Sequence, residues 1–466
     1  MPHTVVVGLG RSGMGAARLL SQSGTSVSVI DSGTGAELDQ RAELLRDQGI
    51  DVRLGVPLEP DSFQIWRAEL QRVVISPGIA WDHPTLQKLR SDGIAIDGEM
   101  AIAWDALNTI PWVAITGTNG KTTVTHLLSH VLQHSGLKAP MGGNMGVSAA
   151  ELGLARRDST AEVPDWLVME LSSYQIEAAQ RIQPRIGIWT TLTPDHLERH
   201  GTLEAYRTIK RGLLERSELA ILNADDPDLR QQRSSWRGGL WVSAEGPKPD
   251  GVAVDLWIDA DGWVRDCDGS LFRATALKLP GRHSLQNMLL VTAAARSIGL
   301  STEQIDSALQ AFQGVAHRLE PLGQLLGMAV FNDSKATNYD AAAVGLQAMQ
   351  GPTVVLAGGS IKQGDASDWL LQLRQRSCGL VLFGAAAAEL KQLIEADSYP
   401  GTVLCCEGLD QAVKLGVELA QQHNACNMLL SPACASFDQY HDFEERGNHF
   451  KKLIKTMQTQ SSKPNR

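Results

Sequence analysis

Features that mark secreted, membrane-embedded and nucleic-acid-binding proteins are scarce in this 466-residue chain. The six cysteines are scattered, with no CxxC pair and no metal-ligand spacing, so we expect buried free thiols in a reducing compartment. The longest apolar runs, such as 379–388, are shorter than the roughly 18 residues that span a bilayer, and the N-terminus lacks the pattern of a secretory signal. Lys and Arg number 42 against 52 Asp and Glu, a net charge of −10 that argues against a nucleic-acid or anionic-lipid partner. We therefore expect a cytoplasmic protein without membrane insertion.

Strand-like apolar runs alternate with amphipathic helical segments along most of the chain, which predicts an α/β protein with mostly parallel sheets. In the last third, apolar runs that begin at 352, 379, 401 and 427 recur at the spacing of βα units. An irregular stretch at 234–275, rich in Gly, Asp and Trp, is interpreted as a β-insert. Because the pattern starts afresh twice, we expect three domains: a Rossmann-like domain over 1–108, a central P-loop ATPase-like domain over 109–314 and a Rossmann-like domain over 315–466.

The first glycine-rich loop has the spacing Gly8-x-Gly10-x-x-Gly13 between a predicted strand and a predicted helix, and the following strand ends at Asp31 and Ser32. Glycines let the backbone approach a diphosphate at a helix N-terminus, and an acid at the end of the second strand can hold a hydroxylated group. The pattern is compatible with a nicotinamide or flavin cofactor, with another nucleotide diphosphate, or with a purely structural turn.

A second glycine-rich loop, GTNGKTT at 117–123, follows a buried strand and opens a helix. Ile115 stands where the usual P-loop has its first glycine, so this loop is a shortened variant. Its backbone N–H groups can cradle phosphates, Lys121 can neutralise the transferred phosphoryl group, and Thr122 can bind Mg²⁺. A dehydrogenase has no need of such a loop. The two loops together indicate ATP as one ligand and a nucleotide handle on the substrate as the other.

Three ionisable residues downstream of the second loop are candidates for metal or phosphate chemistry. Glu170 ends a predicted core strand, which is where a metal-binding carboxylate belongs. His196 lies in the charged segment 193–201, although a histidine taken alone is more often structural than catalytic. Lys210 falls within the apolar stripe of the next predicted helix, either as a side chain that snorkels to water or as a functional group.

Further motifs accompany the second loop in a fixed order: GGN at 142, ELSSYQ at 170, DHLERHG at 195, HRLE at 317, NDSKATN at 332 and SPACASFDQY at 431. Together with GTNGKTT and Lys210, they resemble the Mur ligase family over essentially the whole chain. The third-domain motifs favour the member that adds D-glutamate to UDP-N-acetylmuramoyl-L-alanine. The resemblance implies an ATP-dependent, peptide-bond-forming ligase of peptidoglycan synthesis, and so a role in cell-wall growth, cell shape and cell division. ATP would phosphorylate the L-alanyl carboxylate, and the amine of D-glutamate would attack the acyl phosphate, with release of ADP and phosphate.

The resemblance assigns the first loop to the UDP of the substrate rather than to NAD. It implies two Mg²⁺ ions, one held by Thr122 and Glu170 and the other by His196 and Lys210. An ammonium group would repel Mg²⁺, whereas the CO₂-derived carbamate of the family's lysine makes that side chain an anionic ligand. The implied catalytic residues are Lys121, Asn144, His196 and Lys210. The implied UDP-substrate contacts are Gly8, Gly10, Arg11, Ser12, Gly13, Asp31, Ser32, Ser76, Pro77, Gly78 and Asn144.

The resemblance also implies the contacts of the other two substrates. Because Arg318 and Asp333 belong to the third domain, closure of that domain would complete the ATP site. Two lysines in the amino-acid pocket suit a dicarboxylate. The implied ATP contacts are Gly117, Thr118, Asn119, Gly120, Lys121, Thr122, Thr123, Asn287, Arg318 and Asp333. The implied D-glutamate contacts are Lys335, Thr337, Lys362, Ser436 and Phe443.

Three positions depart from the family pattern, and several alternative functions stay open. Thr191 stands where an asparagine is common, Glu198 replaces a frequent aspartate, and Ser284 replaces an asparagine near the adenine contacts. Sister ligases that add another amino acid, and folylpolyglutamate synthetase, share the three-domain plan. An NAD-dependent oxidoreductase would use only the first loop, and a noncatalytic nucleotide-dependent switch would not need Lys210. We expect a monomeric ligase.

Overall fold

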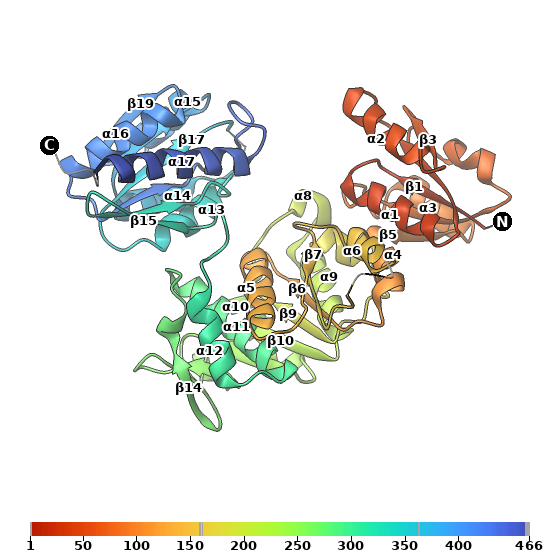
Figure 1. Ribbon diagram of the computed structural model, residues 1–466, viewed down its shortest axis with the longest axis horizontal. Helices are drawn as coiled ribbons and strands as arrows, with labels where there is room; N and C mark the ends of the chain where they lie inside the picture. The colour runs from red at the N-terminus through yellow and green to blue at the C-terminus, as the bar shows by residue number, and fades with distance from the viewer. Residues whose placement is uncertain (1, 158–159, 161, 362–363, 462–466) are drawn as a thin grey trace. The chain divides into compact units, whose positions relative to one another are not determined.

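The chain forms three mostly parallel sheets flanked by helices, which confirms the predicted α/β class (Figure 1). Each sheet lies within one of the three predicted domain ranges, whose limits stay predictions. The computed structural model describes residues 2–157, 160, 162–361 and 364–461. The chain divides into two compact units, Met1–Ala276 with Leu285–Gln310, and Leu277–Ser284 with Ala311–Arg466.

The first sheet is entirely parallel, with the strand order β3-β2-β1-β4-β5. Its central strand, β1, is buried along its whole length, because α1 and α2 cover one face of the sheet and α3 and the 3₁₀-helix η1 cover the other. The carboxyl ends of β1, β2 and β4 lie at one edge, where ligands of such sheets bind. The elements are β1 His3–Val7, α1 Arg11–Gln22, β2 Ser26–Asp31, α2 Ala36–Arg46, β3 Asp51–Leu54, η1 Pro60–Trp66, β4 Leu70–Ile75, α3 Pro84–Ser91, β5 Ala95–Gly98 and α4 Glu99–Leu107.

The second sheet has nine strands in the order β14-β13-β12-β11-β10-β9-β6-β8-β7. Strands β6 to β12 are parallel, and β13 and β14 add an antiparallel hairpin. The stretch 234–275 does contain strands, but β11 and β12 continue the parallel sheet rather than form a separate insert. The strands are β6 Trp112–Thr116, β7 Met141–Gly143, β8 Leu167–Glu170, β9 Ile186–Trp189, β10 Leu219–Asn223, β11 Leu240–Ser243, β12 Leu256–Ile258, β13 Trp263–Asp266 and β14 Gly269–Arg273.

The helices that accompany the second sheet include α5, which packs against β6, β7 and β8, and α9, which packs against β9 and β10. The helices are α5 Lys121–His134, α6 Ala149–Arg157, α7 Ser173–Glu177, α8 Leu197–His200, α9 Leu203–Glu215, α10 Pro227–Gln231, α11 Arg282–Ile298 and α12 Thr302–Ala311, with 3₁₀-helices η2 Arg233–Ser235, η3 Pro249–Gly251 and η4 Ala274–Ala276.

The third sheet has the order β15-β16-β20-β17-β18-β19, in which only β15 is antiparallel to its neighbour. The four strands predicted in the last third are confirmed as β17 to β20. One core lies between the sheet and α13 to α15, and another between the sheet and α16 and α17. The elements are β15 Glu320–Leu325, β16 Met328–Asn332, α13 Tyr339–Gln347, β17 Thr353–Gly358, α14 Ser367–Arg376, β18 Ser377–Phe383, α15 Ala387–Ala396, β19 Thr402–Cys406, α16 Leu409–Gln422, β20 Asn427–Leu430 and α17 Phe443–Ser461.

The cysteines correct one expectation. All six are free thiols, as predicted, but only Cys434 is buried, whereas Cys267, Cys405 and Cys426 are exposed. Isolated cysteines without a cysteine partner carry no sequence signal for burial, so the expectation rested on average behaviour alone. Among the described helices, none has the length and apolar character required to cross a membrane.

Candidate active site

The second glycine-rich loop lies at the carboxyl edge of the second sheet, between β6 and α5. Helix α5 begins after Gly120 with no side-chain cap, as do helix N-termini that bind anions. Lys121 Nζ donates to the carbonyl oxygens of Gly117 and Thr118 at 2.9 and 2.8 Å. The side-chain oxygen of Asn287, on α11, lies against Gly120. The loop, its lysine and Asn287 are therefore brought together as predicted.

The segment after β9 supports this loop through hydrogen bonds. The N–H of Thr118 donates to the Thr191 carbonyl at 2.9 Å, and the N–H of Asn119 donates to the Thr191 hydroxyl at 3.0 Å. The Thr190 hydroxyl in turn donates to the Asn119 carbonyl at 2.5 Å. Thr191 is one of the three departures from the family pattern, and its hydroxyl accepts a hydrogen bond from the loop. An asparagine side chain could accept the same hydrogen bond.

Glu170 and Asn144 meet at the ends of β8 and β7. The Asn144 amide donates to Glu170 Oε1 at 2.9 Å. Glu170 Oε2 is buried and has no hydrogen-bond partner among the described residues. A buried carboxylate oxygen without a partner is costly, so its position at the nucleotide edge of the sheet suits a cation ligand.

Lys210 is the most unusual cationic side chain of this region. It is 1% exposed, which excludes the interpretation of a lysine that snorkels to water. Its Nζ lies 3.0 Å from the Gly117 carbonyl oxygen and 3.3 Å from Thr116 Oγ1, and 4.4 Å from the centre of the Tyr206 ring. Burial lowers the pKa of Lys210 well below its usual range, and the charge of Lys121 lowers it further, against the opposing charges of Asp195 and Glu170.

His196 occupies a more exposed place than the predicted metal-binding role suggests. Its side chain is 45% exposed, with Nε2 3.5 Å from Asp195 and Nδ1 3.7 Å from Glu198. Its ring centre lies 5.2 Å from that of Tyr174. Within the described part of the chain, no group of three or more His, Cys, Asp or Glu side chains is arranged to hold a metal ion.

A second histidine of the same segment escaped the sequence analysis. His200 Nε2 is 2.9 Å from the Ser173 hydroxyl, and its ring centre lies 5.3 Å from that of Tyr174 and 5.4 Å from that of Tyr206. Burial lowers the pKa of His200 to about 4, with the charges of Arg199, His196 and Lys210 adding to the effect. His200 is therefore neutral at physiological pH. The only sequence signal for it is its place in the motif DHLERHG.

The first glycine-rich loop gathers the predicted UDP-substrate residues of β1, β2 and β4. The carboxylate of Asp31 accepts hydrogen bonds from the N–H groups of Leu9 at 2.6 Å and Gly33 at 2.7 Å. A side chain at Gly13 would place Cβ 1.9 Å from the Gly8 carbonyl oxygen, so this helix start tolerates only glycine. The Ser76 hydroxyl lies 3.4 Å from that same oxygen, which places the segment 76–78 beside the loop as predicted.

Two further predicted UDP-substrate residues flank the helix that follows this loop. Arg11, the first residue of α1, donates to the Gly146 carbonyl at 3.0 Å and so contacts the segment that follows Asn144. Ser12 occupies the next helical position, and Ser32 follows the end of β2. The start of α1 has no side-chain cap, which leaves its N–H groups for an anion.

The second unit holds the remaining predicted residues around the carboxyl ends of β16 and β20. Burial raises the pKa of Asp333 to about 7, although Oδ1 accepts from the Leu319 N–H and Oδ2 from the Ser431 hydroxyl. Lys335 Nζ lies 5.1 Å from the centre of the Phe443 ring. Ser436 is buried, Thr337 and Arg318 are half-buried, and Lys362 lies outside the described residues.

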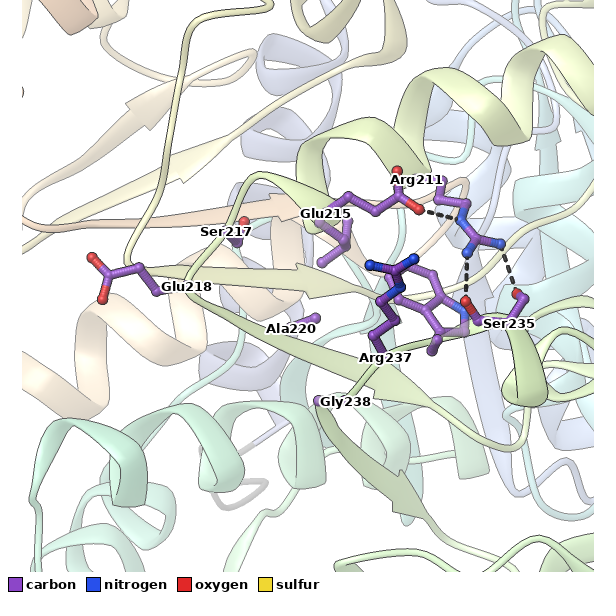
Figure 2. A pocket seen from close by; sticks show the side chains of 11 residues that line it. Arg211, Glu215, Ser217, Glu218, Ala220, Ser235, Arg237 and Gly238 are labelled. Atoms are coloured by element: carbon purple, nitrogen blue, oxygen red, sulfur yellow. Dashed lines mark hydrogen bonds and ion pairs between the residues drawn. The ribbon is translucent and has the colours of Figure 1, made fainter.

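A separate hollow of about 590 Å³ lies at the amino ends of β10 and β11 (Figure 2). Arg211 lines it and donates to Glu215 at 2.7 Å and to the Ser235 hydroxyl at 2.8 Å. Arg211 also lies 4.8 Å from the centre of the Trp236 ring. This hollow is at the edge of the sheet opposite the glycine-rich loop, because α9 runs from one edge to the other. It is therefore not part of the nucleotide site.

Comparisons with known proteins agree with this geometry. The protein-family model described as Mur ligase middle domain matches residues 115–295 of this chain. A second family model, described as Mur ligase MurD-like, N-terminal domain, matches residues 2–98. A UDP-N-acetylmuramoylalanine–D-glutamate ligase of Parasynechococcus marenigrum (strain WH8102) is 66% identical over 459 residues, 98% of this chain and 99% of that protein. This chain belongs to the Mur ligase family. A protein of the same name from Synechococcus sp. (strain CC9605) is 63% identical over 97% of this chain and 98% of its own length.

Solved structures of Mur ligases share the fold. The UDP-N-acetylmuramate–alanine ligase of Thermotoga maritima has a TM-score of 0.57 at 19% identity and covers 99% of this chain and 100% of its own. A pseudomurein peptide ligase type C of Methanothermus fervidus has the same TM-score at 17% identity, covering 98% and 100%. The Mur ligase fold and the ligase class predicted from the motifs are confirmed. Membership in this family argues against an oxidoreductase that uses only the first loop.

Proposed function

We propose that the protein joins D-glutamate to UDP-N-acetylmuramoyl-L-alanine, with ATP as phosphoryl donor and an acyl phosphate as intermediate. The observation that carries this proposal is the 66% identity, along almost the whole chain, to a relative named for that reaction. A carboxylate is a poor electrophile because its oxygen is a poor leaving group. Phosphorylation supplies the leaving group, and the amine of D-glutamate then attacks the acyl carbon with loss of phosphate.

The second glycine-rich loop supplies the phosphate site of this proposal. The uncapped start of α5 offers N–H groups to the ATP phosphates. Lys121 would transfer its hydrogen bonds from the loop carbonyls to the phosphoryl group and so reduce the repulsion between two anions. We assign the loop residues Gly117 to Thr123 and Asn287 to ATP, and we also propose Arg318 and Asp333 as ATP ligands.

Two side chains beside this loop offer oxygen ligands for Mg²⁺. Glu170 offers a buried carboxylate oxygen with no hydrogen-bond partner among the described residues, and Thr122 is buried in the first turn of α5. We propose these two side chains for one ion, and His196 with Lys210 for a second. Bound Mg²⁺ would supply charge neutralisation at the phosphates. Asn144, now on Glu170, would orient the L-alanyl carboxylate.

The surroundings of Lys210 fit a carbamate made from CO₂. Its Nζ is buried beside two neutral oxygens, the Thr116 hydroxyl and the Gly117 carbonyl. Conversion of the Lys210 amine to a carbamate would replace a basic group by an anion, and a site for Mg²⁺ requires a negative charge.

The residues that we assign to the UDP moiety and to D-glutamate lie beside the first and the third sheet. Residues of the first loop, with Asp31, Ser32 and the segment 76–78, would hold the UDP moiety. Lys335, Thr337, Lys362, Ser436 and Phe443 would hold D-glutamate, whose two carboxylates suit cationic partners. A reaction that consumes ATP and a UDP-linked precursor implies a cytoplasmic location, and we propose that the enzyme acts as a monomer.

Phosphate release tests the proposal. The purified protein receives ATP, Mg²⁺ and UDP-N-acetylmuramoyl-L-alanine, with D-glutamate, L-glutamate, L-alanine or meso-diaminopimelate as the amino acid. Release that depends on D-glutamate supports the proposal. Release with another amino acid would assign the chain to a sister reaction, and no release with any of them would contradict the proposed ligation.

A further inference from the structure

Arg446 is a buried cation that no assigned role explains. It lies in the first turn of α17, three residues after Phe443, and is 0% exposed. Burial of a charge is costly, and the N-terminus of a helix carries a partial positive charge that disfavours a cation. The start of this helix is already capped by Asp442, which accepts the Glu445 N–H at 2.7 Å. Arg446 is therefore not needed to begin the helix.

Backbone oxygens, rather than an acid, compensate the guanidinium. Nη1 donates to the carbonyls of Gly358, Cys434 and Ala435 at 3.3, 3.1 and 3.2 Å. Nη2 donates to the carbonyls of Ser334 and Cys434 at 2.8 and 3.1 Å, and Nε donates to the Ser334 hydroxyl at 3.0 Å. Asp438, an acid whose charge reaches this site, accepts instead from the Ala385 N–H at 3.0 Å.

These acceptors lie at the carboxyl ends of three strands: Ser334 follows β16, Gly358 ends β17 and begins the loop after it, and Cys434 and Ala435 follow β20. Ser334 precedes Lys335, and Ala435 precedes Ser436, so two of the loops carry proposed D-glutamate ligands directly beside the contact. The Ser334 hydroxyl also donates to the Phe443 carbonyl at 2.8 Å. The third loop begins at Gly358. A single guanidinium thus connects the backbone on which Lys335, Ser436 and Phe443 are mounted.

The three loops converge closely around this contact. A Cβ at Gly359 would lie 2.1 Å from the Ala435 carbonyl oxygen and 3.0 Å from Arg446 Nη1. The N–H groups of Ser360 and Ala435 each donate to the other residue's carbonyl at 2.9 Å. The carbonyl dipoles that point at the guanidinium stabilise its charge without cancelling it. Burial lowers the pKa of Arg446 to about 10, so it stays protonated at neutral pH.

We propose that Arg446 is a positioning residue for the amino-acid pocket, which sets the three loops around one buried guanidinium and adds positive potential for a dicarboxylate substrate. This inference rests on the proposed addition of D-glutamate. Arg446 does not itself contact the substrate, because its five donors are directed to loop oxygens. A lysine would keep the charge but could not reproduce the planar fork, and a methionine would remove both.

Steady-state kinetics of Arg446→Lys and Arg446→Met test this role, with each of the three substrates varied in turn. For Arg446→Lys we expect KM for D-glutamate to rise about 10-fold, with KM for ATP and for the UDP-linked substrate within about twofold of wild type. For Arg446→Met we expect a rise of about 100-fold, because the charge is lost as well. Ser334→Ala, a milder change, removes the acceptor of Nε and should raise KM for D-glutamate about threefold.

Phe450→Leu is the matched control for a purely structural effect. Phe450 lies one turn further along α17 and is buried in the core between the sheet and α16 and α17. This variant should lower the melting temperature without raising KM for D-glutamate. If Arg446→Lys and Ser334→Ala behave like Phe450→Leu, the positioning role is wrong.

Phosphate release by the wild-type enzyme distinguishes a failure of the proposed function from a failure of the proposed role of Arg446. Phosphate release that does not depend on D-glutamate would contradict the proposed function itself. Release that depends on D-glutamate, together with an unchanged KM for D-glutamate in Arg446→Lys, would contradict only the inference about Arg446. If Arg446→Met does not fold, Arg446→Lys and Ser334→Ala still decide between these outcomes.

Discussion

Two fully buried basic side chains, Lys210 in the first unit and Arg446 in the second, have very different numbers of hydrogen-bond acceptors. Lys210 Nζ has two neutral oxygens within hydrogen-bond distance, and burial lowers its pKa far below the usual range. Arg446 makes six hydrogen bonds, five of them to carbonyl oxygens, and its pKa falls only to about 10. Burial alone therefore does not decide how far the pKa of a base falls.

The two sites use this difference for different purposes. A guanidinium is less strongly hydrated than an ammonium and offers a rigid fork, so carbonyl groups can hold it in its charged form. A buried amine with few acceptors is more easily deprotonated, and a neutral amine is the form that can react with CO₂. We interpret Arg446 as a fixed charge that organises loops, and Lys210 as a side chain kept reactive for modification.

The largest effect is expected from Lys210→Arg, which places a permanent cation at the first site. An arginine keeps its proton and cannot form a carbamate, so we expect phosphate release to fall about 1,000-fold or more. ATP binding, measured by calorimetry, should weaken far less, because the glycine-rich loop is intact.

Arg211→Lys is the matched control for this change. Arg211 is the next residue of α9 but faces the separate hollow, where it pairs with Glu215. Its variant should stay within about twofold of wild-type activity. An active Lys210→Arg enzyme would break the proposed contrast between a modified lysine and a fixed arginine.

The sequence indicated Lys210 as a candidate site residue but gave no indication of Arg446, and the difference has a physical reason. Lys210 could be found because a lysine interrupts the apolar stripe of one helix, a local pattern of 3.6-residue period. Its burial could not be predicted, because it depends on the packing of α9 against β9 and β10. Arg446 gave no such signal: its acceptors at Ser334 and Gly358 are 112 and 88 residues away in the sequence.

The same distinction holds for the rest of the molecule. The strands of the last third and both glycine-rich loops follow from local periodicity and turn chemistry, and the structure contains them. The continuation of the central sheet through β11 and β12 depends on strand pairing, which local patterns do not encode. The exposure of His196 and of three cysteines likewise depends on tertiary packing.

Glu99 is a buried acid that can be compared with the two buried bases, and its substitution should have an effect on stability of intermediate size. This residue begins α4, and its Oε1 accepts the Ala150 N–H at 2.5 Å, while Oε2 has no partner among the described residues. Burial raises the pKa of Glu99 from 4.5 to about 7. The folded protein therefore holds a proton on Glu99 that the unfolded chain releases. Its contribution to stability is complete below about pH 4.5 and is lost as the pH rises through about 7.

Urea unfolding of wild type and Glu99→Gln between pH 5 and pH 8 tests this expectation. Relative to wild type, Glu99→Gln should gain about 3 kcal/mol of stability across that range, because an amide does not ionise. Glu218→Gln removes an exposed carboxylate that pairs with Arg185, and it should change the stability by no more than about 1 kcal/mol at any pH of the series. Parallel profiles for wild type and Glu99→Gln would show that Glu99 does not titrate in this range.

The smallest effect is expected at Thr191, where a hydrogen bond without charge supports the ATP loop at a solvent-exposed position. Thr191→Val keeps the shape but removes the acceptor of the Asn119 N–H, so KM for ATP should rise about threefold. Thr191→Asn supplies another acceptor and should stay within about twofold. A rise of KM for ATP above about 30-fold in either variant would contradict this prediction. It would mean that a neutral contact at the surface has as large an effect as the buried groups Lys210 and Glu99.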